Sequence, residues 1–488
     1  MSTISLIRQG ILLIAAFLTL NACTPTPSHP QKDSALPPMY PDYTDVWIPC
    51  NIAPLNFMLR GDYDAVELLA TCGEDELKVN ERGNCVRIGE KTWRKFLNKV
   101  AGKEVTVTVT ALKDGQWTAY QPFTWTVTTD AIDPFLTYRL IEPDYEIYQN
   151  LSLRERCLEN FDERAICDYG LVGNRCMNCH TYGQQSSELS MLYVRGEGGG
   201  AILNQKGKLT KLAIKTDDMA SGSVYFGFSP NGRYITFSTN VIIPAFHAMP
   251  SKRLEVFDST SDVYVADLQT NTILRSPLLN DSTVFETFPT FSPDGRYIYY
   301  CTAKAVTLPG ELRDMRYSLC RIGFDEKTGA IGTQVDTLFS GPREKRSVCH
   351  PRVSPDGQYI VYTVADYGTF PIWHPESDLQ MMNLSTGSTD TLSTVNSAKS
   401  DTYHSWSSNS RWLVFASKRD DGLYGKPYFT YIDRQGKAHK PFVLPQCDPT
   451  FYDLNLKSFN VPELGGGRLP FSAADVKRAV ESTPIGMK

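Results

Sequence analysis

One short motif in this sequence can support chemistry that few side chains offer, Cys176-Met177-Asn178-Cys179-His180. Two thiols three residues apart can form thioethers to the two vinyl groups of one porphyrin, and the following histidine can bind its iron as an axial ligand. The motif therefore predicts one covalent haem c, held by Cys176 and Cys179, with His180 on the iron. A redox-active cysteine pair, half of a zinc site and a chance match are the alternatives.

The second axial position decides whether such an iron transfers electrons or performs catalysis. His247 and Met249 lie in 242–250, a loop that interrupts an otherwise repetitive region, and long loops on rigid scaffolds tend to be functional. We expect His247 to be the distal ligand, with Met249 as the alternative, or else an exposed loop histidine without a role. For His350 and His404, which each precede a repeated turn, packing or the lining of a channel is expected.

The N-terminal residues read as a targeting signal. Arg8 precedes an apolar run over 11–20, and Leu-Asn-Ala then leads into Cys23, which is the layout of a secretory signal. These four residues resemble the lipobox of bacterial lipoproteins, so we expect a signal peptide over 1–22 and a lipid on Cys23. The proline-rich stretch 23–39 would be a tether. The protein is therefore expected to be exported and anchored to a bacterial membrane, on its periplasmic or cell-surface side.

Composition and motif searches exclude several other classes. The chain has 488 residues, of which 41% are hydrophobic, and a formal net charge of −5, so it is globular and has no basic footprint for nucleic acid. It contains no GxSxG, HExxH or phosphate-binding GKS/T motif. Among the other cysteines, Cys72 with Cys85 and Cys157 with Cys167 could form disulfides.

Residues 40–130 are expected to form a β-sandwich of the immunoglobulin-like kind. The segment 104–110 alternates apolar and polar residues, and 117–128 is rich in aromatic and β-branched residues, as strands are. Asp114-Gly115 between them is typical of a hairpin turn, and a short helix is expected over 92–99.

The segment 131–188 is expected to carry the haem. Its residues 151–161 have apolar positions near helical spacing, and a turn-rich stretch then leads into the cysteine motif. We treat it as a separate attachment segment between the sandwich and the repeats.

A repeat occupies 189–462, followed by a tail over 463–488. Its copies share a turn of the type Ser-Pro-Asp-Gly and occur at Phe228–Tyr234, Phe291–Tyr297, Val353–Tyr359 and, degraded, Trp406–Trp412. The turns recur every 53 to 63 residues, which leaves room for about four strands in each unit. A four-stranded unit repeated around an axis is a propeller blade.

These repeated turns, each followed by an apolar strand, resemble the TolB-like (PD40, WD40-like) β-propeller family. The resemblance implies a mainly β fold with five or six blades. Together with the cysteine motif, the arrangement is similar to propeller-bearing c-type cytochromes and, more distantly, to the catalytic subunit of hydrazine synthase.

The expected function is that of a membrane-anchored, exported monohaem cytochrome that transfers electrons to or from a partner redox protein or another periplasmic protein. The first alternative is a haem enzyme acting on a small substrate such as a nitrogen compound or a peroxide. The second is a propeller module that binds proteins or glycans and uses haem as a structural staple.

Overall fold

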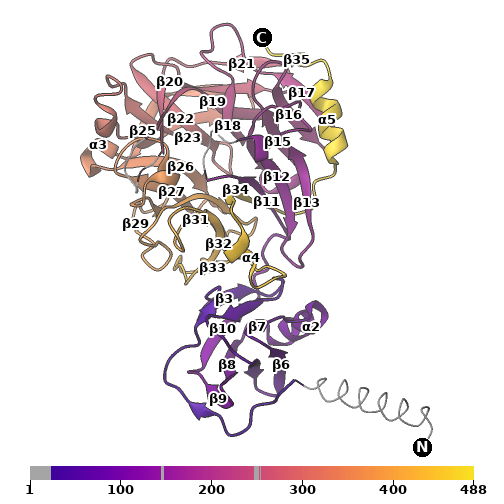
Figure 1. Ribbon diagram of the computed structural model, residues 1–488. Coiled ribbons are helices and arrows are strands. Elements are labelled where there is room, and N and C mark those ends of the chain that lie inside the picture. Colours follow the sequence, from indigo (N-terminus) through magenta and orange to yellow (C-terminus); the bar gives the residue numbers. More distant parts are fainter. Residues whose placement is uncertain (1–23, 144–147, 247–251, 253) are drawn as a thin grey trace, which may run out of the picture. The chain divides into compact units, whose positions relative to one another are not determined.

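The computed structural model describes residues 24–143, 148–246, 252 and 254–488 of the chain (Figure 1). The described chain forms two compact units. The first contains the residues up to 48, together with 53–129 and 445–454, and the second contains 49–52, 130–444 and 455–488. Both units are mainly β. None of the helices in the described ranges is long and apolar enough to cross a membrane.

The first unit has two sheets and one helix of three turns. The larger sheet contains β1 (Gln31–Lys32), β3 (Val46–Pro49), β5 (Ala65–Cys72), β6 (Asp75–Arg82), β8 (Glu104–Lys113), β9 (Gln116–Ala119) and β10 (Phe123–Thr128). The smaller contains β2 (Met39–Tyr40), β4 (Phe57–Leu59) and β7 (Cys85–Val86). The short α4 (Phe451–Leu454) also belongs to this unit. The immunoglobulin-like class stays a prediction.

Helix α2 (Glu90–Val100) confirms the helix expected over 92–99. Its buried residues are Trp93, Phe96, Leu97 and Val100, and this spacing places them on one face. Trp93 meets Trp125 of β10 edge to face, with ring centroids 5.6 Å apart. The helix therefore covers the hydrophobic face of the larger sheet.

The second unit is a β-propeller, as the repeats predict, and its described residues form six blades. With strands given from the axis outward, the first blade contains β34 (Ser458–Gly465), β11 (Phe135–Ile141), β12 (Ser152–Cys157) and β13 (Glu163–Asp168), and the second contains β14 (Met177–Gly183), β15 (Ser186–Val194), β16 (Gly200–Gln205), β17 (Lys208–Ala213) and β35 (Ile485–Gly486). The third blade contains β18 (Ser223–Phe228), β19 (Tyr234–Phe246), β20 (Leu254–Asp267) and β21 (Thr272–Leu274), and the fourth contains β22 (Val284–Phe291), β23 (Tyr297–Lys304), β24 (Ser318–Asp325) and β25 (Ala330–Phe339). The fifth blade contains β26 (Ser347–Val353), β27 (Tyr359–Ala365), β28 (Asp378–Asn383) and β29 (Thr389–Asp390), and the sixth contains β30 (Asp401–Trp406), β31 (Trp412–Ser417), β32 (Lys426–Tyr431) and β33 (Phe442–Val443).

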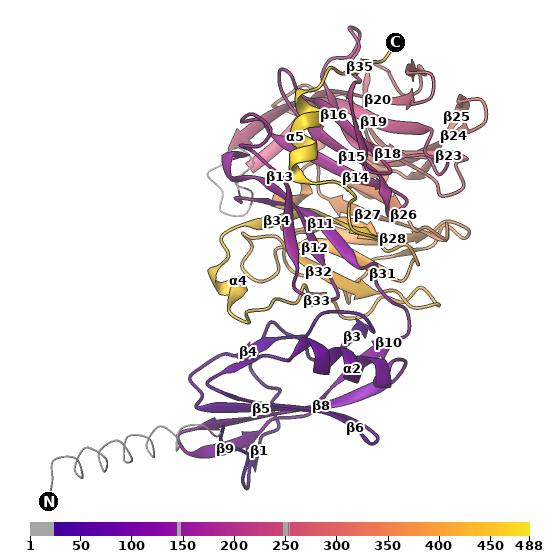
Figure 2. The same cartoon turned by 90° about the vertical axis from the view of Figure 1, so that its right-hand side faces the viewer.

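The six inner strands form a closed ring, because each of β14, β18, β22, β26, β30 and β34 contacts the next and β34 contacts β14 again. The ring is closed by the C-terminal part of the chain, since β34 pairs antiparallel with β11. Helix α5 (Ala473–Glu481) then lies along β13, β16 and β17 (Figure 2). Hydrophobic clusters fill the spaces between blades, as where Phe285 and Tyr299 of one blade pack with Val348 and Tyr362 of the next.

The structure differs from the boundaries expected around the cysteine motif. Residues 131–188 are not a separate segment, because they supply β11, β12 and β13 of one blade and the inner strand β14 of the next. The near-helical spacing over 151–161 is misleading, since Ser152–Cys157 is a strand flanked by β11 and β13. Likewise 463–488 is not a tail, because it includes part of β34 as well as α5 and β35.

The repeated turn is held by its own side chains. In the second copy, the Ser292 hydroxyl donates to Asp294 Oδ1 at 2.6 Å and accepts from the amide of Tyr297 at 3.0 Å. Gly295 follows with φ +70°, a conformation that favours glycine. The same serine bonds recur in the other three copies, at Ser229, Ser354 and Ser407. These turns connect each inner strand to its neighbour and fix the register of the blade.

Candidate functional site

Four inner strands carry an aromatic residue at the same irregularity near the axis, which β34 also has at Val461. In β18, β22, β26 and β30 the pairing register shifts by a β-bulge. At each bulge one residue has a positive φ: Tyr225 (53°), Phe288 (52°), His350 (52°) and Tyr403 (49°). Bulges of this kind change the direction of a side chain.

The four rings form one group, which we call the axial aromatic cluster. Ring centroids are 4.4 Å apart for Tyr225 and Phe288, 4.2 Å for Phe288 and His350, and 4.8 Å for His350 and Tyr403. A positive φ at such bulky residues costs on the order of 1–3 kcal/mol each, so the packing of the ring of blades must hold them in place. The result is a rigid aromatic surface built from four consecutive blades.

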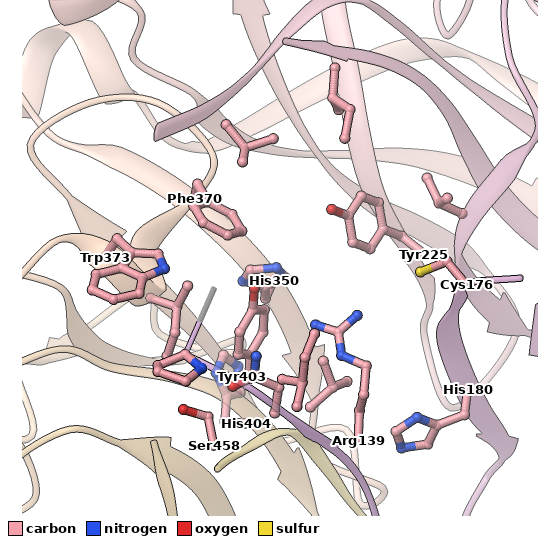
Figure 3. A pocket seen from close by; sticks show the side chains of 18 of the residues that line it. Arg139, Cys176, His180, Tyr225, His350, Phe370, Trp373, Tyr403, His404 and Ser458 are labelled. Atoms are coloured by element: carbon pink, nitrogen blue, oxygen red, sulfur yellow. The ribbon is translucent and has the colours of Figure 1, made fainter. Parts of the chain in front are cut away.

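A cavity of about 130 Å³ is lined by three members of this cluster, Tyr225, His350 and Tyr403 (Figure 3). We call it the axial pocket. The rest of its wall includes Arg139, Cys176, His180, Arg352, Phe370, Trp373, His404 and Lys418. A single water needs about 10–15 Å³ by this kind of measure, and an apolar cavity of about 150 Å³ is known to hold benzene. The axial pocket therefore has room for a ligand with one ring.

The charges on this wall are mostly positive. Of its described lining residues, Arg139, Arg352 and Lys418 are cations and Glu142 is the acid. Lys418 is 3% exposed, and its ammonium lies 3.3 Å from the centre of the Trp373 ring. A cation placed over an aromatic face is stabilised by the ring quadrupole. The pocket thus combines positive charge with apolar, aromatic surface.

The three histidines of the wall are held neutral by their surroundings. Burial lowers the pKa of His180 to about 3, and the nearby charge of Arg139 acts in the same direction. Burial and Arg352 lower the pKa of His404 to about 3, although its bond to the Val361 carbonyl opposes this. The pKa of His350 is also lowered well below its usual value, by burial and by His404 and Arg352. At neutral pH these rings add no charge.

A buried network supports one side of the axial pocket. The His374 ring lies between two carboxylates, with Nε2 2.8 Å from Glu255 and Nδ1 3.1 Å from Glu376. Lys252 also pairs with Glu376, at 2.6 Å, and the Tyr367 hydroxyl donates to Glu255 at 2.9 Å. Because His374 directly follows the 3₁₀ turn Pro371–Trp373, these bonds fix the turn that presents Ile372 and Trp373 to the pocket.

The cysteine motif lies partly on this wall. Cys176 and His180 both line the axial pocket (Figure 3), and burial raises the pKa of the Cys176 thiol. The side chain of Cys179 lies outside the described residues, as do His247, Met249 and Cys23. The motif itself runs into strand β14, where successive side chains point to opposite faces. The covalent haem on Cys176 and Cys179, with His180 as axial ligand, stays a prediction.

The structure brings His350 and His404 together with His180, which their separation in the sequence does not indicate. The sequence patterns did not predict the three cations of the pocket wall or most of its aromatic side chains. A signal for the axial aromatic cluster exists, because its four members each lie four residues before the serine of a repeated turn. Aligning the residues upstream of the turns, rather than the turns alone, would have found it.

The candidate disulfides do not form. Cys72, Cys85, Cys157 and Cys167 are all free thiols, and Cys157 and Cys167 are buried. Burial raises the pKa of Cys167 to about 12, so these side chains act as small apolar groups within the fold.

Comparison with known proteins identifies no family for this chain. No protein-family model matches the sequence, and no curated protein is similar to it. The similar solved structures include a prolyl endopeptidase (15% identity, TM-score 0.34), with 64% of this chain matched to 42% of that chain. They also include an oligogalacturonate lyase in complex with manganese (12%, TM-score 0.31; 70% of this chain and 86% of that one). Dipeptidyl peptidase 4 of Porphyromonas gingivalis is a third (9%, TM-score 0.29; 62% and 48%). The chain thus spans less than half the length of either peptidase.

These findings correct the expected function. The prediction of an electron-transferring c-type cytochrome is not supported by the comparison, since the three similar structures named above are two peptidases and a lyase and none of them is a cytochrome. In addition, the described residues contain no group of three or more His, Cys, Asp or Glu that could hold a metal ion. The two alternatives, a haem enzyme and a binding module with a structural haem, have no support among these structures either, and the haem itself stays a prediction.

Proposed function

We propose that the protein is a ligand-binding propeller whose axial pocket takes a small anion with one apolar or aromatic ring. The observation that carries this proposal is the pairing of three cations with aromatic side chains around one cavity. Ligand sites in proteins are typically apolar cavities with a few converging polar groups. The axial pocket has this composition at the centre of the ring of blades.

Electrostatics favour an anion in this position. Arg139, Arg352 and Lys418 contribute three positive charges to the wall, and the buried histidines remain neutral. Inside a protein, the attraction between a carboxylate and such cations is much less screened than in water. Hydrogen bonds to charged groups contribute about 1.5–3 kcal/mol, so a carboxylate adds a measurable part of the binding free energy.

The aromatic side chains account for the rest of the ligand. Trp373, Phe370 and Tyr225 line the pocket together with the apolar Ile141 and Ile372. Flat rings prefer stacked or edge-to-face contact with aromatic side chains. A benzoate-sized molecule satisfies both requirements, since its ring meets this surface and its carboxylate meets the cations.

Titration calorimetry with benzoate and the neutral benzamide tests this proposal. We expect benzoate to bind the purified protein, and Lys418→Met to weaken its binding by about tenfold, which corresponds to ~1.4 kcal/mol. Methionine keeps the contact with Trp373 but lacks the charge. Arg296→Gln is the matched control, because its side chain is 77% exposed in a turn outside the pocket. Equal affinity for benzoate and benzamide would refute an anion site.

We further propose that the propeller belongs to the TolB-like class and is tethered to a membrane through a lipid on Cys23. The three near-identical turns support the class, and the lipobox-like Leu-Asn-Ala-Cys supports the anchor. In a bacterial host that processes lipoproteins, Cys23→Ser should move the protein from the membrane fraction to the soluble fraction. A variant that remains fully in the membrane fraction would contradict the anchor.

A further inference from the structure

We propose that the axial pocket selects anions that also carry a hydroxyl, and that this hydroxyl donates a hydrogen bond to Nδ1 of His404. The ligand class is therefore a single-ring hydroxycarboxylate. This inference rests on the proposed function and adds a specificity element to it, because it names a second polar group that the ligand must present.

The hydrogen bonds of His404 fix its tautomer. Nε2 lies 2.8 Å from the carbonyl oxygen of Val361. A carbonyl can only accept, so Nε2 carries the hydrogen and donates it. Of the two ring nitrogens, Nδ1 is therefore the one left to accept whenever the ring is neutral.

The ring is neutral under ordinary conditions. His404 is 4% exposed, and burial together with the charge of Arg352 lowers its pKa to about 3. His350, the other histidine beside it, is held neutral in the same way. Nδ1 of His404 thus presents a lone pair and no proton at neutral pH.

This lone pair has no hydrogen-bond partner within the described part of the protein, although the atom is buried. A buried acceptor without a donor costs about as much as a lost hydrogen bond. His404 lines the axial pocket, and we infer that a ligand bound there supplies the donor.

The surrounding charges decide what kind of donor it is. A cationic partner would lie beside Arg352, which is close enough to affect the pKa of His404, and in a pocket that also contains Arg139 and Lys418. Like charges repel strongly at this range in a protein interior. A neutral hydroxyl meets the lone pair without that repulsion, while the carboxylate of the same molecule meets the cations.

Titration calorimetry with matched benzoates tests the inference. The probes are benzoate, its three monohydroxy isomers and the corresponding methoxy compounds, which have similar shapes but cannot donate. We expect at least one hydroxybenzoate to bind about 5- to 30-fold more tightly than benzoate and than its methoxy counterpart. The remaining isomers report where on the ring the hydroxyl must lie.

The variant His404→Gln provides the second arm. The glutamine amide can still donate to the Val361 carbonyl, but it has no acceptor at the position of Nδ1. We expect this variant to lose the preference for the hydroxyl, so that the preferred hydroxybenzoate binds it no more tightly than benzoate or the methoxy counterpart does. His439→Gln is the matched control, since His439 bonds Asp433 and does not line the pocket.

The outcomes separate the two claims. If benzoate binds but no hydroxybenzoate binds more tightly, the inference is overturned and the anion site stands. The same holds if the preference survives in His404→Gln. If neither benzoate nor any hydroxybenzoate binds the wild-type protein, the proposed function fails, and this inference fails with it.

Discussion

Burial determines the protonation state of the histidines near the propeller axis. The pKa values of His180, His350 and His404 are all lowered because these rings are enclosed. In the unfolded chain a histidine has a pKa near 6.5. The unfolded state therefore binds more protons than the folded state below this pH, and stability falls as the pH falls.

Replacing His404 should reduce this acid sensitivity. Between pH 6.5 and about pH 3, His404 costs the folded state up to ~1.4 kcal/mol per pH unit, and a glutamine does not titrate. We expect the free energy of unfolding of His404→Gln to fall less steeply with decreasing pH than that of the wild type. Urea unfolding at pH 7, 6, 5 and 4.5 measures it, and parallel curves would contradict the assignment.

Glu286 in β22 shows the opposite pH dependence. It is 1% exposed, and burial together with Asp262 and Asp281 raises its pKa to about 9. Since the value in the unfolded chain is near 4.5, folding takes up a proton between these two pH values. The contribution of Glu286 to stability is present below pH 4.5 and is lost as the pH rises towards 9.

Glu286→Gln should therefore stabilise the protein increasingly as the pH rises from 5 to 8.5, by up to ~1.4 kcal/mol per pH unit. Glutamine has nearly the same shape but takes up no proton. The difference in unfolding free energy between variant and wild type, measured in urea at three pH values, checks this. A difference that stays constant with pH would show that Glu286 is ionised in the folded state.

At the scale of elements, the blades depend on backbone conformations that only certain residues adopt without cost. Each repeated turn needs a positive φ, which Gly232, Gly295 and Gly357 supply at 69–72°. In the degraded fourth copy Ser410 takes this position, with φ 60°. A non-glycine residue in this conformation costs about 1–2 kcal/mol, so the turn of the fourth copy is less stable than a glycine turn by about that amount.

Gly357→Ala isolates this backbone effect. A methyl group at Gly357 meets no atom within 4 Å, so its cost comes from φ +72° alone. We expect a loss of about 1 kcal/mol in the free energy of unfolding. Gly486→Ala is the matched control, since a methyl there also meets nothing and φ is not positive. Equal effects of the two substitutions on chemical denaturation would rule out the conformational explanation.

The sequence was sufficient to predict those elements whose conformation depends on residues close together in the chain. The Ser-Pro-Asp-Gly turns, the propeller and helix α2 follow from turn chemistry and periodicity. The pattern over 151–161 failed because β12 is flanked by strands on both sides, so its burial reflects tertiary contacts and not helical spacing. The axial pocket could not be assembled, since Arg139 and Lys418 come from different blades almost 280 residues apart in the chain.

At the level of the whole propeller, the ring is held together by its first three strands in sequence and a strand near the C-terminus, which form one blade. Strand β34, near the C-terminus, pairs with β11 and completes the blade that contains β12 and β13. Leu469, Phe471 and Val476, which follow β34, are buried in the cluster that joins this blade to the next. Propellers of this kind leave only short, protected strand edges.

Truncation after Lys457 should therefore prevent cooperative folding of the propeller, because it removes β34 together with α5 and their buried residues. Truncation after Glu481 is the control, since it removes only β35 and the last residues. We expect a sharp thermal transition from the longer form and none from the shorter. A cooperative transition with unchanged midpoint in both would show that β34 is not needed for closure.

The axial pocket is proposed to bind a hydroxylated single-ring anion. A crystal structure of the protein with the tightest-binding hydroxybenzoate tests it most directly. We expect ligand density within the ring of inner strands, with the carboxylate against Arg139, Arg352 or Lys418. The ligand ring should lie against the aromatic wall, and its hydroxyl within hydrogen-bond distance of His404 Nδ1. A ligand bound only elsewhere, or in the pocket with its carboxylate turned away from all three cations, would contradict it.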